Sequence, residues 1–453
     1  MDTPFPFEPV LVFGIMAIML LVGVILRAKI KFFQNFLIPS CFIGGTLGLI
    51  LISTRLIDVS VDLLETFAYH LFIISFISLG LTAGIKKNTD DSFKSLIRGP
   101  LWIGLVSGVV MAMQGIVGGL LVFLLNATGF NLNPLFGFLS PLGFTQGPGQ
   151  ALSVGKVWEE FGFAHAATLG LSFAVFGFAF AFFVGVPLVN WGIRKGYAAL
   201  TPRALPLEIL RGIMQKDAKK EAAGELTTHS GNIDTLAFHA ALVGLVYILT
   251  YLLLLAIGKF ISVDVAKSLW AFFFFFAVVI ALLIKALINK TGLGYLLDAG
   301  VQKRITGWAV DFLIVATIMA IQVVVVWEYI VPILLIGLVS GILTTLVVFY
   351  FGRRTWGYSL ERMVGMYGIA TGTATTGLLL LRIADPEFET PVALELGIQA
   401  LFAAPFVLSY MLLMHAPLWW GWSVQAVVLV YAGAMVLAYV LLMLFKMIGP
   451  RRF

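Results

Sequence analysis

The chain has 453 residues, of which 60% are hydrophobic and only 11% are charged. Soluble domains carry roughly 25% charged residues, so this composition excludes an ordinary soluble protein and indicates a chain embedded in lipid. The single cysteine, Cys41, excludes an intramolecular disulfide, and the net charge of +6 comes with no nucleic-acid-binding motif.

Eleven apolar segments reach the length of about 20 residues that a helix needs to cross a bilayer. In chain order they are 9–27, 36–54, 67–84, 99–125, 163–192, 236–258, 268–285, 306–326, 329–351, 391–413 and 419–445. Asp2 and Glu8 precede the first segment, where a cleaved signal peptide would have a basic region. We therefore interpret this segment as a spanning helix with its N-terminus outside the cell.

Two further apolar segments, 133–160 and 364–388, are interrupted by glycine and polar residues, in GFTQGPGQALS (143–153) and GIATGTATTG (368–377). If each segment enters the membrane and returns to its own side, the basic residues gather on one side, as the positive-inside rule requires. Of the 29 lysines and arginines, the only ones on the other side are then Arg55, Lys156, Lys259 and Lys267. The sequence therefore predicts two re-entrant hairpins, a cytoplasmic linker at 193–235 and a cytoplasmic C-terminus.

The two interrupted segments align with each other, so that Gly143 pairs with Gly368 and Gly147 with Gly372. Each follows four apolar segments and precedes a fifth, and an odd number of crossings inserts the second half upside down. We predict an all-α polytopic membrane protein with two inverted repeats of five transmembrane helices, each with a re-entrant glycine-rich hairpin, plus one extra C-terminal helix. The expected parts are the first repeat 1–192 with its hairpin 133–160, the linker 193–235, the second repeat 236–413 with its hairpin 364–388, and 414–453 with the extra helix.

Broken helices at membrane depth expose backbone N–H and C=O groups, which are tolerated only where they line a cavity or contact protein. Helix N-termini attract anions, whereas unwound carbonyls and threonine hydroxyls suit a hard cation such as Na⁺. Inverted repeats with broken segments at matching positions are typical of secondary transporters. The pattern therefore favours a transporter whose small anionic substrate and coupling ion bind between the two hairpin tips.

The residues at and near the two tips are the candidate site residues. For the substrate, the candidates are Gln146, Gly147, Gly149, Gln150, Thr371, Gly372, Ala374 and Arg382. For Na⁺, they are Thr145, Thr373, Thr375, Thr376 and Glu395. The glutamines would hydrogen-bond polar groups of the substrate, and the backbone amides would hold its carboxylate. No cofactor and no metal other than Na⁺ is expected.

Several stretches resemble the sodium/glutamate symporter family. The longest, 143–196, is similar in its glycine-rich loop, in the turn WEEFGF (158–163) and in the long helix that follows. IPSCFIGGTLGLIL (38–51), FISLGLTAGI (76–85) and YGIATGTATTG (367–377) are similar to the family's second helix, third helix and second glycine-rich loop. The resemblance implies inverted five-helix repeats with two re-entrant loops, Na⁺-coupled uptake of an acidic amino acid, and a homodimer.

Ionisable residues at membrane depth leave alternatives open. His70, Asp311 and Glu395 lie within apolar segments, where such groups are rare and often functional. Proton coupling through Glu395 or Asp311 is therefore an alternative to Na⁺ coupling, and a channel with re-entrant filter loops is a second alternative. The sequence has no phosphate loop, zinc-ligand spacing or nucleophile elbow, so we do not expect an enzyme.

Taken together, these patterns predict a multi-pass protein of the cell inner membrane. We expect a sodium-coupled symporter of an acidic amino acid such as glutamate, or of a related small carboxylate. Its alternating access would be of the elevator type, in which the hairpin-bearing helices shift against a scaffold. That scaffold would contain the second span, whose Gly44 and Gly45 permit close packing.

Overall fold

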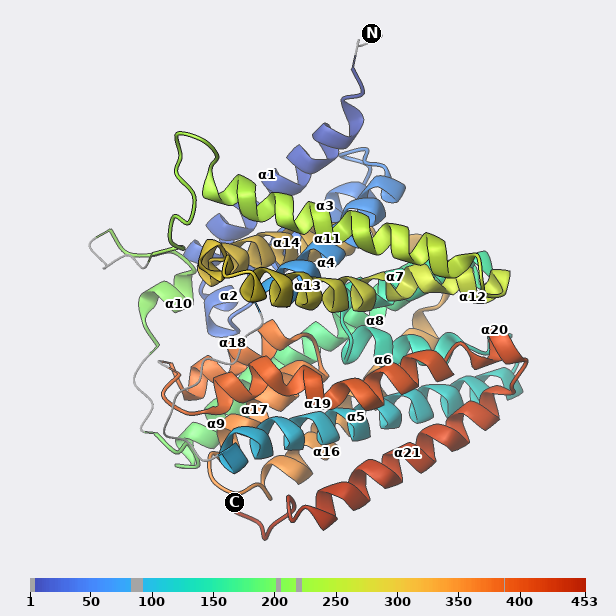
Figure 1. The fold of residues 1–453 in the computed structure, drawn as a ribbon. Coiled ribbons are helices and arrows are strands. Elements are labelled where there is room, and N and C mark those ends of the chain that lie inside the picture. The colour runs from blue at the N-terminus through green and yellow to red at the C-terminus, as the bar shows by residue number, and fades with distance from the viewer. Residues whose placement is uncertain (1–4, 83–92, 201–204, 217–221, 387) are drawn as a thin grey trace.

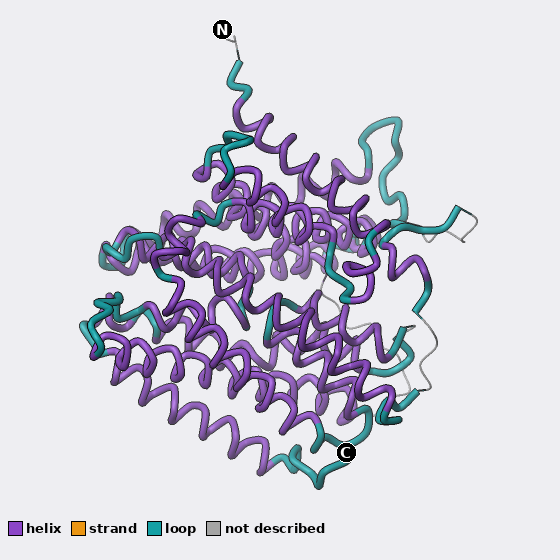
Figure 2. The backbone as a smooth tube through the Cα atoms, turned by 180° about the vertical axis from the view of Figure 1, so that it is seen from behind, coloured by secondary structure: helices purple, strands orange, loops and turns teal. Residues whose placement is uncertain are grey.

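The computed structural model describes residues 5–82, 93–200, 205–216, 222–386 and 388–453. Within these ranges the chain is helical and contains no strand (Figures 1 and 2). The helices of the first half are α1 (Glu8–Lys29), α2 (Lys31–Asn35), α3 (Ser40–Ser53), α4 (Val61–Thr82), α5 (Phe93–Ala127), α6 (Leu139–Phe144), α7 (Pro148–Glu160), α8 (Ala166–Phe180) and α9 (Val186–Arg194).

The linker helix α10 (Leu207–Arg211) precedes the helices of the second half. These helices are α11 (Thr235–Gly258), α12 (Val263–Ser268), α13 (Phe273–Lys290), α14 (Ala299–Met319), α15 (Val323–Glu328), α16 (Ile330–Gly352), α17 (Ser359–Ala370), α18 (Ala374–Ala384), α19 (Val392–Leu413), α20 (Ala416–Trp420) and α21 (Val424–Leu444).

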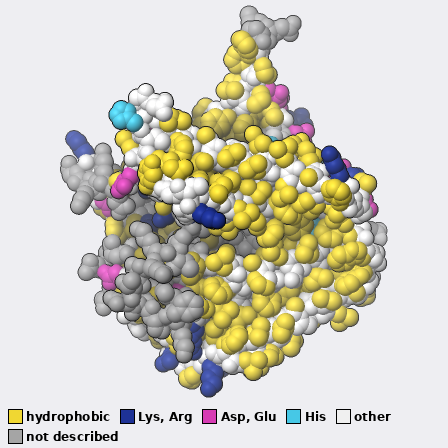
Figure 3. Space-filling model, in the orientation of Figure 1, with side chains coloured by type: hydrophobic (Ala, Val, Ile, Leu, Met, Phe, Trp, Pro, Cys, Tyr) yellow, Lys and Arg dark blue, Asp and Glu magenta, His cyan; other side chains and the backbone are white. Residues whose placement is uncertain are grey.

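Nine helical segments of the described chain are long and apolar enough to cross a membrane. They correspond to nine of the eleven predicted spans, and the face of the molecule in Figure 3 is mostly hydrophobic, as lipid contact requires. The other two predicted spans are helical but differ from the expectation. The helix at 36–54 is shortened to the 14 residues of α3, and α14 begins before 306 and carries Lys303, Arg304 and Asp311.

Most of the helices, long and short, form two bundles that lie one above the other in Figure 1. The α4/α14 bundle consists of α1, α3, α4, α11, α13 and α14, and the α5/α19 bundle consists of α5, α6, α8, α9, α16, α17, α18, α19 and α21. Helix α7 lies between them and packs on both α8 and α4. The predicted close packing of the second span is found in the α4/α14 bundle. A Cβ added at Gly44 would collide with the Met19 backbone oxygen, and one at Gly45 would lie 3.0 Å from Ile318 Cβ.

The end of α1 and the start of α5 lie at one end of the molecule, on the left in Figure 1, and carry Arg27 and Arg98. Arg27 donates hydrogen bonds to Ile38 O at 2.8 Å and to Ile209 O of the linker helix at 2.9 Å. At the same end, the Arg98 guanidinium donates to the backbone oxygen of Lys446, near the C-terminus, at 2.9 Å. We call this the basic end. The opposite end carries α12 and α20, which are joined by a hydrogen bond from Trp419 Nε1 to Ser268 Oγ at 2.8 Å.

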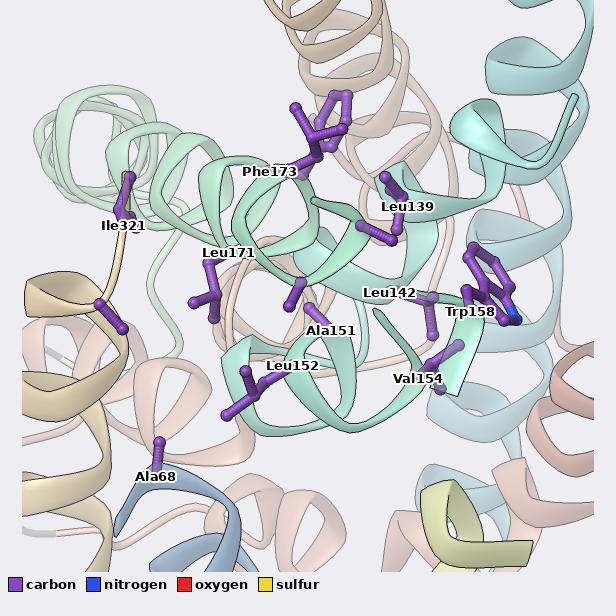
Figure 4. Close-up of a cluster of buried hydrophobic side chains, with 14 of the residues drawn as sticks. Ala68, Leu139, Leu142, Ala151, Leu152, Val154, Trp158, Leu171, Phe173 and Ile321 are labelled. Carbon is purple, nitrogen blue, oxygen red and sulfur yellow. The ribbon is translucent and has the colours of Figure 1, made fainter. Parts of the chain in front are cut away.

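Two helical hairpins reach the middle of the molecule from opposite ends. In the first hairpin, α6 and α7 run antiparallel along α8. Buried side chains of all three helices, among them Leu139 of α6, Ala151 of α7 and Leu171 of α8, form one apolar cluster (Figure 4). In the second hairpin, α17 and α18 pack closely, because Gly368 and Gly377 have no side chains. The second hairpin begins at the basic end, where Ala199 N of the linker donates to Glu361 Oε1 at 2.7 Å.

Candidate functional site

The tips of the two hairpins touch each other. The first tip comprises residues 145–147 and the second residues 371–373. Gly147 has φ +84°, a conformation that favours glycine, and a Cβ added there would lie 3.1 Å from Thr373 Cγ2 and 3.3 Å from Gly372 O. The tip therefore requires glycine at 147 for its conformation, and the close approach of the tips leaves little space for a side chain there.

Helix α8 supports both tips at a single glycine. A Cβ added at Gly177 would lie 2.6 Å from Thr371 O of the second tip and 3.2 Å from Phe144 Cα, directly before the first tip. The crossing of two hairpins over one helix therefore depends on the absence of a side chain at this position. No sequence pattern indicated this role, since Gly177 is one of many glycines in apolar segments.

Four helix ends converge where the tips meet. Helix α7 begins at Pro148 with Gly147 as its N-cap, and α18 begins at Ala374 with Thr373 as its N-cap. The Thr373 hydroxyl accepts a hydrogen bond from Thr376 N at 3.4 Å. The C-terminal ends of α6 and α17 lie beside these N-termini. The tips therefore offer partial positive charge from two N-termini and carbonyl oxygens from two C-termini.

Most of the predicted substrate residues are brought together at the tips. Gln146 is half-buried, with Nε2 3.3 Å from Met111 Sδ of α5. Gln150 is 4% exposed, and its Oε1 atom has no hydrogen-bond partner among the described residues. Thr371 is buried and donates its hydroxyl hydrogen to Tyr367 O at 2.7 Å. The remaining tip candidates are Gly147, Gly149 and Gly372, which are buried, and Ala374, which is exposed.

Arg382 lies apart from the other candidates. It is in the last turn of α18, away from the tip, and its guanidinium carbon stands 4.7 Å from the centre of the Phe388 ring. The structure therefore does not place the Arg382 charge between the tips.

Three of the predicted Na⁺ ligands lie at or beside the tips. Thr145 is buried and donates to Gln114 Oε1 at 2.5 Å, and the hydroxyls of Thr373 and Thr376 are 3.3 Å apart. Thr375 is exposed at the start of α18. The Thr373 methyl group faces Gly147, so threonines of both hairpins lie near the contact between the tips.

Glu395 is occupied by a different partner. Arg362 of α17 donates from Nε to Glu395 Oε2 at 2.8 Å and from Nη2 to Glu395 Oε1 at 2.6 Å, and both side chains are buried. A side chain at Gly99 of α5 would collide with this carboxylate. In this structure Glu395 therefore joins α17 to α19 and does not face the tips.

Sequence reasoning missed Gln114, which connects the two hairpins, and Thr344, which accepts a hydrogen bond from Gln114. Gln114 of α5 is fully buried, and its Nε2 atom donates to Thr344 Oγ1 of α16 at 2.9 Å and to Ala370 O of α17 at 3.2 Å. A glutamine inside the apolar segment 99–125 was a signal that could have identified Gln114, because a buried amide needs partners. Thr344 gave no comparable signal.

A separate cavity lies at the opposite end of the molecule. Its volume is about 350 Å³, and it is lined by Val61, Asp62, Glu65, Lys156, Glu159, Ala164, His165 and Gln322. Lys156 Nζ of α7 lies 2.5 Å from Glu65 Oε2 of α4 and 3.3 Å from Glu159 Oε2. The pair with Glu65 therefore joins α7 to the α4/α14 bundle. Nearer the tips, the gap beside Pro148, Phe178 and Thr317 leaves no room for a water molecule.

Comparison with known proteins adds one finding. The family model described as "Sodium/glutamate symporter" matches residues 7–380 of the chain. A search of curated proteins returns no match.

The ion pair between Lys156 and Glu65 predicts an asymmetric response to mutation. The Lys156 side chain is 44% exposed, whereas Glu65 is 5% exposed. Lys156→Met leaves a buried carboxylate without a cation, so we expect the free energy of unfolding to fall by about 3 kcal/mol. Glu65→Gln leaves a cation that water reaches, so we expect a fall of less than about 1 kcal/mol. Thermal unfolding in detergent measures both, with exposed Lys259→Met as the control. Equal losses from the two variants would contradict the predicted asymmetry.

Proposed function

The chain belongs to the sodium/glutamate symporter family, and from this membership and the geometry of the tips we propose a sodium-coupled symporter of glutamate or a closely related acidic amino acid. The observation that carries the proposal is the contact between the two hairpin tips, Gly147 against Gly372 and Thr373. This contact brings two helix N-termini, with threonines beside them, into one region of a multi-pass membrane protein.

The substrate carboxylate would bind at the N-termini of α7 and α18. Backbone N–H groups at the first turn of a helix have no partner within the helix, and the helix dipole favours an anion there. Gln150 extends this site, because its buried Oε1 atom is an unused hydrogen-bond acceptor. An ammonium group would satisfy that acceptor and a second carboxylate would not. The amide nitrogen of Gln150 can also donate to a carboxylate, so Gln150 suits both the ammonium and the carboxylate groups of an acidic amino acid.

The coupling ion would bind among the hydroxyls of Thr145, Thr373 and Thr376 and the carbonyls at the ends of α6 and α17. Hard cations take oxygen ligands of this kind at unwound helix ends. Glu395 is left out of this proposed set, because Arg362 holds both of its oxygens. The same pairing weakens the alternative of proton coupling through Glu395, because both carboxylate oxygens already accept hydrogen bonds from Arg362.

We further propose that the hairpins are re-entrant and that the two halves form inverted repeats. The packing of the helices supports this proposal. Helix α3 packs on α14 as α13 packs on α4, and α1 packs on α3 as α11 packs on α13. Here α1, α3 and α4 of the first half correspond to α11, α13 and α14 of the second. Each contact therefore has a counterpart in which the two halves have changed places, as a pseudo-two-fold axis produces.

Alternating access would follow from movement of one bundle against the other. Both hairpins are attached to the α5/α19 bundle, whereas the second span belongs to the α4/α14 bundle. The interface between the bundles includes the apolar contact of Gly149 with the Phe72 ring and the narrow gap beside Thr317. This apolar part of the interface permits sliding, and the ion pair between Lys156 and Glu65, which also crosses the interface, would separate during the movement. A channel instead requires a continuous wet path through the filter.

The proposed site predicts distinct effects of tip substitutions on transport. In proteoliposomes we expect glutamate uptake that depends on an inward Na⁺ gradient. Gln150→Leu should raise the KM for glutamate roughly 5- to 150-fold, the equivalent of about 1–3 kcal/mol for a lost hydrogen bond to a charged group. Thr373→Val should raise the Na⁺ concentration for half-maximal uptake.

The matched control for the glutamine is Gln399→Leu on α19. Gln399 is also buried and also has an Oε1 atom without a partner among the described residues, but it lies outside the tips. We expect its KM to equal that of the unmodified protein. Uptake that is indifferent to Na⁺, or an equal rise in KM for both glutamine variants, would refute the proposed site.

We also propose that the basic end faces the cytoplasm, as the positive-inside rule requires. Ser230 in the linker and Ser262 beside α12 are both exposed and lie at opposite ends of the molecule, and Cys41 is buried. In intact cells an impermeant thiol reagent should label Ser262→Cys, and it should label Ser230→Cys only after permeabilisation. The reverse pattern would invert the proposed orientation.

A homodimer is the proposed assembly. Polar side chains of two apolar helices are exposed, namely Thr66 and His70 on α4 and Asp311 on α14, and Gly307, one turn before Asp311, is exposed as well. Polar groups are costly against lipid, which supports a second copy of the chain as their cover. Light scattering of the detergent-solubilised protein should give the mass of two chains. Gly307→Trp should reduce it to one chain and Gly433→Trp, on exposed α21, should not. A monomeric unmodified protein would exclude the dimer.

A further inference from the structure

Gln114 makes hydrogen bonds to both hairpins although it belongs to neither. Its Oε1 atom accepts from Thr145 Oγ1 at 2.5 Å, and its Nε2 atom donates to Ala370 O at 3.2 Å and to Thr344 Oγ1 at 2.9 Å. Thr145 is the first residue after α6, and Ala370 is the last residue of α17. The side chain is fully buried, so these partners replace water entirely.

The partners determine which way the amide points. A backbone carbonyl only accepts hydrogen bonds, so the group that faces Ala370 O must be the amide nitrogen. The amide oxygen then faces Thr145. Turning the amide over would place two acceptors against each other at Ala370, which costs the desolvation of both. The end of α17 therefore sets the orientation of Gln114.

The orientation of Gln114 in turn determines the role of the Thr145 hydroxyl. A hydroxyl carries one hydrogen and two lone pairs. Because the hydrogen is donated to Gln114 Oε1, the lone pairs of Thr145 remain free on the other side of the oxygen atom. An oxygen in this state is a ligand for a hard cation, whereas a hydroxyl whose hydrogen points at the ion repels it.

We propose that Gln114 is a positioning residue for Na⁺ that holds the Thr145 hydroxyl in its ion-binding orientation and links it to the end of the second hairpin. This inference rests on the proposed function, in which Thr145 contributes to the coupling-ion site. Gln114 itself does not touch the ion. A displacement of α17 that removes the Ala370 carbonyl releases the amide and with it the Thr145 hydroxyl, so the first hairpin senses the state of the second.

A double-mutant cycle tests this role, with Na⁺ affinity read from the rise in thermal unfolding temperature with Na⁺ concentration. Gln114→Met keeps the length of the side chain and removes both hydrogen-bonding groups, and we expect the half-saturating Na⁺ concentration to rise about tenfold. Thr145→Val should raise it at least as much. The double variant should equal Thr145→Val alone, because Gln114 acts only through Thr145.

Two controls separate positioning from general stability. Gln399→Met removes another buried amide and should leave Na⁺ affinity unchanged. Thr145→Ser keeps the hydroxyl, and in that background Gln114→Met should again weaken Na⁺ binding. A purely structural role would lower the unfolding temperature of Gln114→Met without changing its Na⁺ dependence. That result, or additive effects in the double variant, would overturn the proposal.

The same titration distinguishes failure of the inference from failure of the proposed function. Na⁺-dependent stabilisation without glutamate uptake would refute the proposed symport of glutamate. The double-mutant cycle of Gln114 and Thr145 would still test the positioning role, because it measures Na⁺ binding alone. Uptake with a Na⁺ dependence that Gln114→Met does not alter would refute the positioning role alone. An unmodified protein that Na⁺ neither stabilises nor drives would overturn both.

Discussion

Backbone polar groups that leave a helix inside a membrane must find partners within the protein, and this constraint explains most features of the middle of the molecule. Each hairpin tip ends one helix and begins another, so it leaves carbonyl and amide groups that neither helix satisfies. The two tips are set against each other and are covered by α5 and α8. Gly147 and Gly177 make this contact possible through their lack of side chains, and Gln114 supplies an amide to Thr145 and Ala370.

The sequence predicted what depends on local composition. Hydropathy indicated helices in a membrane, and the nine apolar helices together with the family match confirm a multi-pass membrane protein of the expected family. The glycine-rich segments and their alignment also pointed to residues that the structure brings together, such as Gly147 and Thr373. The use of these residues for substrate and ion remains a prediction.

What the sequence could not predict depends on contacts between distant segments. Glu395 was a candidate because it is a carboxylate in an apolar segment, but its partner Arg362 lies 33 residues earlier on another helix. Gly99, on a third helix, makes the space that the pair occupies. Gln114 lies 256 residues from Ala370, so no local pattern relates them. Arg382 belongs to the same helix as the second tip, yet it lies on the last turn rather than the first. Hydropathy also did not indicate that α3 would be cut to 14 residues.

The gap beside Pro148, Phe178 and Thr317 is too narrow for water, and this has a consequence for energy conversion. In a transporter driven by an ion gradient, an ion that crosses the membrane without the substrate dissipates the gradient and transports nothing. A hydrated ion cannot enter a passage that excludes even a single water molecule, and stripping its hydration shell against apolar side chains costs many kcal/mol. In a gradient-driven transporter, the dry part of the interface beside Pro148 and Thr317 would therefore act as a seal against leakage, and tight packing there would limit how much of the stored gradient is lost as heat.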